Sequence, residues 1–395
     1  MPADDKQETL GAIFGRFLKF GLLAWGGPVA QIAMLRRELV DEQKWLSPGR
    51  FNRLLAIYQI LPGPEAHELC VHFGMMKRGR LGGLLAGLGF MLPGLLLMLA
   101  LAWLYGHLDL ARPPFAALFV GVQIGVIALI VRSVHRIGEH VLVDRALWAI
   151  ASGSAVATLL GVSFWIVLPS AALAYFLATT GRRAWAIAVI GASAAIALLA
   201  HQQEIPVASG AALVTNGSVE LALLFVAGLK AGLLTFGGAY AAIPFVREDA
   251  VGRGWVSDGQ FLDGLALSGI IPAPLIMFTT FVGFQAGGLG GALAITIGVF
   301  LPAFAFGMAF FDRLERAIED RRLHCLLEGV AAGVVGLIVA TTIDLGSDAA
   351  RSAPSLPPAA AIFAGALALL YLWRSKLCVL AVILASAASG LIAFD

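Results

Sequence analysis

Long apolar segments separated by short polar ones make up most of this chain of 395 residues. A helix that crosses a membrane needs roughly 20 mostly apolar residues, and the pattern predicts thirteen such spans. They cover 12–35, 54–75, 84–105, 115–131, 146–161, 162–179, 184–200, 220–244, 262–286, 292–311, 325–343, 360–373 and 377–394. The boundary near Gly161 is the weakest, because 146–179 is nearly continuous apolar sequence. Nothing alternates with the period of a membrane β-barrel, so the sequence predicts an all-α polytopic membrane protein.

The composition agrees with a membrane location. Of the residues, 59% are hydrophobic and 13% are charged, whereas soluble proteins are typically about 45–50% apolar and about 25% charged. Lipid must therefore be the main solvent, and we expect a multi-pass membrane protein. The net charge of +2 is too small to suggest a nucleic-acid partner. The three cysteines show no metal-ligand spacing, so neither a metal nor another cofactor is expected. The polar, acidic first ten residues do not have the pattern of a cleaved signal peptide.

The chain contains an internal repeat. Motifs of the first half recur in the same order in the second half, at offsets that drift only from 211 to 209. The matched pairs are Lys19 and Lys230; Gly26-Gly27 and Gly237-Gly238; Arg37-Glu38 and Arg247-Glu248; Trp45 and Trp255; Phe51 and Phe261; Pro62-Gly63-Pro64 and Pro272-Ala273-Pro274; and Leu92-Pro93 and Leu301-Pro302. Shared glycines and prolines alone would be weak, but Lys, Arg-Glu and Trp match as well. The sequence therefore predicts repeats at 1–181 and 220–395, joined by a linking helix and loop at 182–219.

An odd number of spans from one repeat to the next would turn the second repeat upside down, as in many secondary transporters. Loop charge tests this layout, because cytoplasmic loops are enriched in Lys and Arg. The thirteen-span order places sixteen cations on one side and seven on the other, and five of those seven lie in one loop, 36–53. Either this loop departs from the rule for a functional reason, or 54–75 is a hairpin that returns to the side of the membrane from which it entered. The amino terminus is predicted to be cytoplasmic.

Two kinds of helix breaker lie within apolar spans of both repeats. They are Gly26-Gly27-Pro28 with its partner Gly237-Gly238, and Pro62-Gly63-Pro64 with its partner Pro272-Ala273-Pro274. Irregular backbone at membrane depth persists only where protein or a watery cavity satisfies it. A broken helix also presents free N–H groups and a partial positive charge, which suit an anion. The alternative is a simple proline kink. The double occurrence favours a substrate site that includes Gly26, Gly27, Gly63, Gly237 and Gly238.

Charged residues within the spans give further candidates. Lys19 and Lys230 occupy equivalent places and could compensate the charge of an anion, although snorkelling to the membrane surface would also explain them. Glu65, Glu68 and His72 lie at positions i, i+3 and i+7 of one helix face in the first repeat only. They are candidates for proton coupling, although a first-turn acid favoured by the helix dipole would also account for Glu65.

These stretches resemble the chromate ion transporter family. The similarity rests on Trp25-Gly26-Gly27-Pro28-Val29-Ala30-Gln31-Ile32-Ala33, Leu61-Pro62-Gly63-Pro64-Glu65-Ala66, Gly82-Gly83 and Leu92-Pro93-Gly94. It extends over nearly the full length of the long, two-domain members. The resemblance implies halves of opposite orientation and efflux of chromate that confers chromate resistance, with sulfate as a chemically similar ion. Its first motif adds Gln31 to the candidate substrate-binding residues. The second half departs from the first at Ala239, Ala273 and Leu275.

The leading hypothesis is a secondary transporter that moves chromate or a similar tetrahedral oxyanion outward, driven by membrane potential, with proton exchange as an additional drive. The alternative is an uptake carrier or anion channel for sulfate-like ions. An intramembrane enzyme would need a nucleophile with its base or a metal-binding motif such as His-Glu-x-x-His, and the densest polar cluster lacks that order. The expected partners are the oxyanion and the lipid bilayer. The sequence leaves the oligomeric state open, with a homodimer as one expectation.

Overall fold

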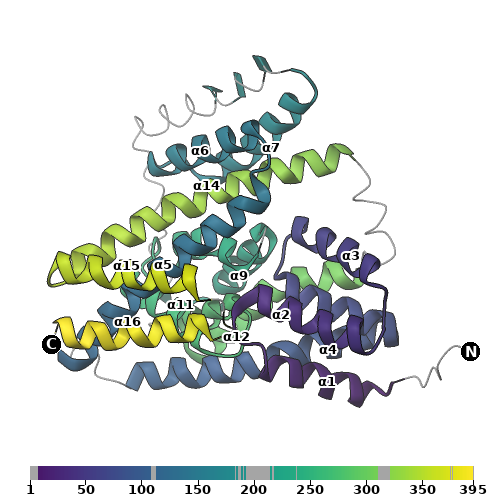
Figure 1. Ribbon diagram of the computed structural model, residues 1–395, viewed down its shortest axis with the longest axis horizontal. Helices are drawn as coiled ribbons and strands as arrows, with labels where there is room; N and C mark the ends of the chain where they lie inside the picture. The colour runs from purple at the N-terminus through teal and green to yellow at the C-terminus, as the bar shows by residue number, and fades with distance from the viewer. Residues whose placement is uncertain are drawn as a thin grey trace, which may run out of the picture.

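A computed structural model describes residues 8–107, 113–182, 184–185, 188–189, 191–192, 214–215, 218–236, 238–309, 321–373, 375 and 377–394. These residues are almost entirely helical, and Figure 1 shows the long helices running across the molecule between its two termini. A short antiparallel pair, β1 (Val214–Thr215) and β2 (Ser218–Val219), precedes the second half. Most of the predicted linking span 184–200 lies outside the described residues.

The first half contains seven α-helices and one π-helix among its described residues. They are α1 (Leu10–Leu22), α2 (Gly27–Leu35), η1 (Arg36–Glu42), α3 (Pro48–Ile60), α4 (Glu65–His107), α5 (Pro113–Val141), α6 (Arg145–Leu159) and α7 (Phe164–Thr179). Local sequence explains several of their ends. The hydroxyl of Ser47 accepts a hydrogen bond from the backbone N–H of Arg50 at the start of α3, and Asp144 caps α6 in the same way.

Helices α3 and α4 form a hairpin around residues 61–64. The Tyr58 hydroxyl lies 2.9 Å from Nδ1 of His72, whereas in one continuous helix these residues would be about 21 Å apart. The rings of Phe51 and Phe73 also stack at 6.4 Å. Because α3 has only 13 residues, it is about 20 Å long, shorter than the roughly 30 Å of bilayer hydrocarbon.

The long helix α4 itself doubles back. Arg78 and Gly79 leave helical geometry, and Gly79 has φ 58°. The close approach of Gly74 to Gly82 shows that the limb before this turn packs antiparallel to the limb after it. A glycine is needed at position 79 because side chains disfavour positive φ.

The second half repeats this order of elements. It comprises α9 (Leu221–Leu234), η2 (Ala239–Ala242), α10 (Ile243–Ala250), α11 (Asp258–Ile270), η3 (Leu275–Met277), α12 (Phe278–Ala309), α14 (Arg321–Ser352), α15 (Leu356–Leu372) and α16 (Cys378–Phe394). Helix α12 doubles back at Gly287 and Gly288, with backbone angles within about 10° of those at Arg78 and Gly79. The hydroxyls of Thr280 and Thr296, on opposite sides of this turn, are 2.7 Å apart.

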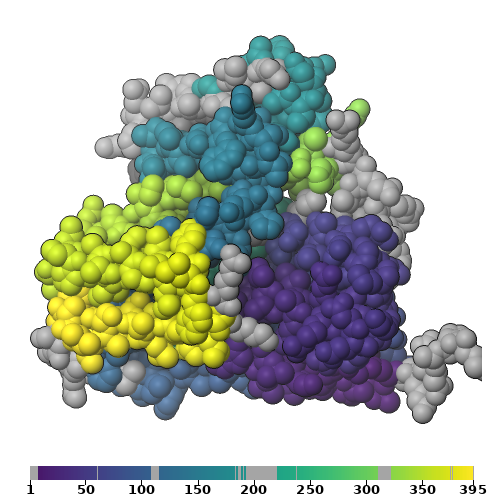
Figure 2. Space-filling view, viewed as in Figure 1, coloured from purple at the N-terminus to yellow at the C-terminus, as the bar shows by residue number. Residues whose placement is uncertain are grey.

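The two halves interlock. Helix α5 packs against α15 and α16 of the second half, α14 packs against α6 and α7 of the first, and α4 packs against α12. Figure 2 shows α1–α3 and the last two helices side by side on one face, with α6 and α7 above them. Four helical segments among the described residues are long and apolar enough to cross a membrane: α4, α5, the segment from η3 through α12, and α14.

The predicted layout of thirteen straight spans is therefore not confirmed. The predicted spans 12–35, 54–75, 220–244 and 262–286 each contain two helices separated by a break, because glycines and prolines interrupt them. The hairpin alternative for 54–75 matches the structure. The weak boundary near Gly161 is a real turn, since α6 ends at Leu159 and α7 begins at Phe164.

Candidate functional site

Four helix breaks, two from each half, meet inside the molecule. They are residues 23–26 and 61–64 of the first half, and 235–238 and 271–274 of the second. The Gly63 N–H donates a 2.8 Å hydrogen bond to the carbonyl of Thr235. The Gln31 amide donates 3.0 Å bonds to the carbonyls of Ala24 and Ala273. Each break of one half is thus tied to a break of the other half.

Glycine at these breaks has a conformational reason. Gly26, Gly27, Gly63 and Gly238 have φ values of 90°, 76°, 149° and 111°, which disfavour any residue with a Cβ atom. A Cβ atom at Gly63 would also lie 2.6 Å from a carboxylate oxygen of Glu68. The chain can therefore reverse and pack closely at these points.

A cavity of about 350 Å³ lies beside three of the breaks. Its walls include the first turn of α2, the start of α4, the start of η2, the last turns of α5 and the second turn of α14. The lining residues are Pro28, Val29, Ala56, Gln59, Glu65, Ser133, Arg136, Ile137, His140, Val141, Val143, Gly238, Ala239, Tyr240, Leu327, Glu328 and Ala331. Since a water takes up about 30 Å³ in the liquid, the cavity can hold a small oxyanion together with several waters.

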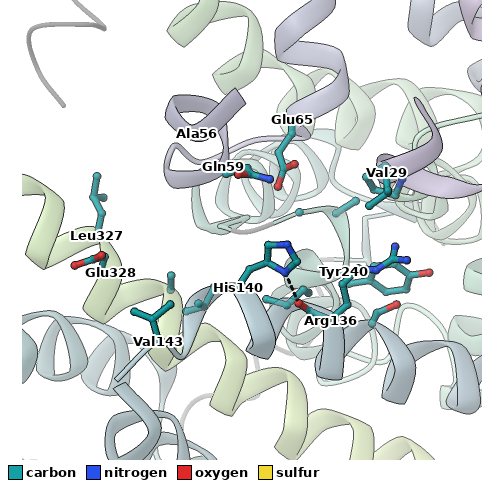
Figure 3. Close-up of a pocket in the computed structure, with 17 residues that line it drawn as sticks. Val29, Ala56, Gln59, Glu65, Arg136, His140, Val143, Tyr240, Leu327 and Glu328 are labelled. Atoms are coloured by element: carbon teal, nitrogen blue, oxygen red, sulfur yellow. Dashed lines mark hydrogen bonds between the residues drawn. The ribbon is translucent and has the colours of Figure 1, made fainter. Parts of the chain in front are cut away.

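The charged groups of the cavity lie on opposing walls. Arg136 and His140 extend from α5, while Gln59 at the end of α3 and Glu65 at the start of α4 face them (Figure 3). Arg136 and His140 are exposed, so the cavity is open on that side, whereas Glu65 is only 8% exposed. Glu328 is engaged by His324 at 3.1 Å. Arginine and protonated histidine donate hydrogen bonds that suit an oxyanion.

The structure brings some predicted residues to this cavity and leaves others behind it. Gly238 lines it, and Gly26 and Gly27 directly precede Pro28 in its wall. Gly63 and Gln31 connect the breaks behind the wall, and the amide donors of Gln31 are engaged by backbone carbonyls. Gly237 lies outside the described residues. The role of these glycines and of Gln31 in binding substrate stays a prediction.

The two candidate lysines form ion pairs and are not among the cavity-lining residues. Lys19 is 3.9 Å from Glu38, and its side chain is 62% exposed. Lys230 pairs with Asp249, and these side chains are only 14% and 8% exposed. The Lys230 ammonium also lies 5.0 Å from the centre of the Phe164 ring. Partners in the protein thus account for both cations, and snorkelling suits Lys19 better than Lys230.

The three candidate coupling residues face different surroundings. Glu65 lines the cavity. Glu68 is fully buried beside Gly63, and its carboxylate oxygens have no hydrogen-bond partner among the described residues. His72 is hydrogen-bonded to Tyr58. Only Glu65 therefore has direct access to a substrate, while Glu68 lies one helical turn deeper.

Arg136 and His140 are not among the site residues predicted from the sequence, because the predicted span 115–131 ends before them and leaves Arg136 in a loop. In the structure α5 continues to Val141. The spacing of four residues between Arg136 and His140 places both on one helix face, and this basic periodicity was the available signal.

Comparison with known proteins identifies the family of the chain. A family profile described as chromate transporter matches residues 11–198 and again 222–391. The chain belongs to the chromate transporter family. The two matches to this family model leave residues 199–221 between them.

Relatives in the chromate transporter family cover nearly the whole chain. A chromate transport protein of Pseudomonas aeruginosa is 61% identical over 97% of this chain and 92% of its own length. A chromate transport protein of Cupriavidus metallidurans is 30% identical over 89% and 85%, respectively. No solved structure matches the chain. Membership of this family and the apolar helices together support a multi-pass membrane protein. The names of the relatives suggest an ion transporter and not an enzyme.

Proposed function

We propose that this protein is a secondary transporter of the bacterial inner membrane that exports chromate and thereby confers chromate resistance. The observation that carries the proposal is the cavity at which helix breaks of both halves meet and two basic side chains face inward. Broken helices at a repeat interface are a recurrent way to bind an ion in secondary transporters. The names of the relatives support chromate as the ion.

Loop charge supports a revised membrane layout. If each helix hairpin returns to the face from which it entered, the five cations of 36–53 join the basic side, and Arg247 and Arg253 leave it. Nineteen of the same twenty-three cations then lie on one side, and the remaining four are Arg112, Arg247, Arg253 and Arg351. We infer nine crossings and four re-entrant hairpins, with the halves 1–181 and 220–395 in opposite orientation and 182–219 between them.

The cavity opens in the direction that loading of an exported anion requires. Its open wall consists of the end of α5 and the beginning of α14. In the revised layout these helix ends lie on the basic side, which the positive-inside rule assigns to the cytoplasm. The cavity would then receive its anion from inside the cell.

Membrane potential can drive this export without ATP. Moving two negative charges out of a cell with a negative interior gains roughly 4.6 kcal/mol per 100 mV, from about 2.3 kcal/mol per charge. Proton exchange through Glu65, Glu68 and His72 would add to the drive. The same site would also serve an uptake carrier or channel for sulfate-like anions, which only the direction and coupling of flux can separate.

The test is chromate flux in proteoliposomes that contain the purified protein and a potassium gradient with valinomycin. We expect a negative potential on the α5–α14 side to drive chromate out of that side, and a reversed potential to reverse the flux. Protein-free vesicles are the control. Absence of protein-dependent chromate flux at either polarity would contradict the proposed function, and channel-like flux that does not saturate would favour the alternative.

A further inference from the structure

We propose that Arg136 and His140 bind the oxyanion directly and set a preference for doubly charged ions. This inference rests on the proposed function, because it identifies the side chains that would hold the exported anion. Neither residue forms a salt bridge among the described residues, and both line the open cavity opposite the start of α4 (Figure 3).

Helix α5 carries two Arg/His pairs, and only the second faces the cavity. The Arg132 guanidinium lies 4.5 Å from the centre of the Tyr371 ring, and Nδ1 of His135 is 2.8 Å from the hydroxyl of the same tyrosine. The first pair thus packs against α15. Arg136 and His140, one turn further along, line the cavity instead, where a ligand can reach them.

The geometry of His140 gives it a charge requirement. Its Nδ1 lies 2.9 Å from the carbonyl oxygen of Arg136, and a carbonyl can only accept, so Nδ1 carries a proton. In the neutral ring Nε2 is then an acceptor, which would repel an anion. Only the protonated ring can donate from Nε2 to an oxyanion. Arg136 with protonated His140 therefore supplies two positive charges, which match a dianion.

Other titratable groups around the cavity bear on this match. Glu65 on α4 faces the pair, Tyr240 on η2 lies beside it, and Glu328 on α14 is paired with His324. An ionised Glu65 would oppose the charge of the pair, so a dianion binds best when Glu65 and His140 are both protonated. We expect the affinity for sulfate, which stays a dianion near neutral pH, to fall as pH rises.

The experiment compares Arg136→Gln and His140→Gln with Arg132→Gln and His135→Gln, which remove the same side chains from the same helix outside the cavity. Chromate uptake is measured in proteoliposomes, with sulfate and perchlorate as competitors of similar shape and different charge.

Losing a charged hydrogen bond should raise the chromate KM about 10- to 100-fold, with sulfate inhibition weakened far more than perchlorate inhibition. His140→Gln should also flatten the pH dependence of sulfate inhibition. The control variants should keep the KM within about twofold.

The outcomes separate the two proposals. Absence of chromate flux in the wild-type protein would refute the proposed function itself. A transporting wild type with Arg136→Gln and His140→Gln variants that keep its KM, its preference for sulfate over perchlorate and its pH profile would overturn the present inference. If Arg136→Gln does not assemble, Arg136→Lys and His140→Gln decide. Arg136→Lys, which lacks the planar guanidinium, should raise the KM for chromate. His140→Gln should lose the pH dependence of sulfate inhibition. Wild-type behaviour in either variant counts against the proposal.

Discussion

In the first half the Pro62 break leads directly into Glu65 and Glu68, whereas in the second half the equivalent break leads into Leu275 and Phe278. The backbone nevertheless reverses at both places and doubles back again at Gly79 and Gly288. The repeat therefore supplies the scaffold twice but acids directly after this break only once. This difference suggests that the anion passage is shared between the halves and that protonation chemistry belongs to the first.

A second contrast concerns one ion pair that occurs in both halves. Lys19 pairs with Glu38 and Lys230 pairs with Asp249, and both partners are nineteen residues apart. The structure thus makes Asp249 the counterpart of Glu38, although the sequence pattern matched Glu38 with Glu248. The first pair is long and exposed, while the second is buried. Equivalent positions can therefore differ greatly in energy.

Breaking the buried pair should have the largest effect. Lys230→Ala leaves Asp249 with Arg253, at 3.1 Å, as its one ion-pair partner among the described residues, and losing one partner of a buried pair costs about 3–5 kcal/mol. Lys19→Ala, the matched control, should cost about 0–1 kcal/mol. Thermal unfolding in detergent, followed by size-exclusion chromatography, measures both. Adding Asp249→Asn to Lys230→Ala should recover part of the loss. Equal unfolding temperatures for the two alanine variants would contradict the contrast.

Exchanging Gly63 and Ala273, which occupy equivalent places in the breaks of the two halves, should have an intermediate effect on stability. Gly63→Ala places a Cβ atom at φ 149° and 2.6 Å from Glu68, so we expect a loss of about 1–3 kcal/mol and a lower chromate flux. The reverse change, Ala273→Gly, adds mainly backbone freedom to the unfolded chain and should cost about 0.4–1 kcal/mol. Unfolding temperature and flux are read on both variants. A Gly63→Ala protein as stable and active as Ala273→Gly would show that this break needs no glycine.

Much of the scaffold could be predicted from the sequence because its determinants are local. Apolar length identified the membrane helices, and the positions of Gly63 and Pro272 identified the breaks. The direction in which a chain leaves a break depends on long-range packing, such as Tyr58 against His72. No local pattern encodes that direction, so four broken hairpins were predicted as spans.

The candidate site was predicted less completely than the scaffold. Glu65 and Gly238 could be anticipated because a buried acid and a break are unusual in apolar sequence, and both line the cavity. For Arg136 and His140 the sequence offers only their four-residue spacing, and a polar helix end looks the same whether it enters solvent or lines a cavity. Lys19 and Lys230 drew attention as cations in apolar spans, but their partners lie nineteen residues away along the chain.

Removing Glu65 and Glu68, which have no counterparts after the second-half break, should have the smallest effect on transport and the most specific one. Glu65→Gln and Glu68→Gln keep the size of each side chain but cannot ionise. In the wild type, rising pH ionises these carboxyls and their charge opposes a dianion, so the apparent affinity for sulfate should fall. In the variants this part of the pH dependence should disappear. For Glu65→Gln we expect a change in affinity of about threefold to tenfold at high pH, because water in the open cavity screens the charge of Glu65. Affinity at low pH should stay near that of the wild type. The measurement is sulfate inhibition of chromate flux at several pH values, with Glu139→Gln as the control, since that acid is not among the cavity-lining residues and lies 3.6 Å from His135. Wild-type pH profiles in both Glu65→Gln and Glu68→Gln would mean that the acids serve the fold alone and that membrane potential is the only drive.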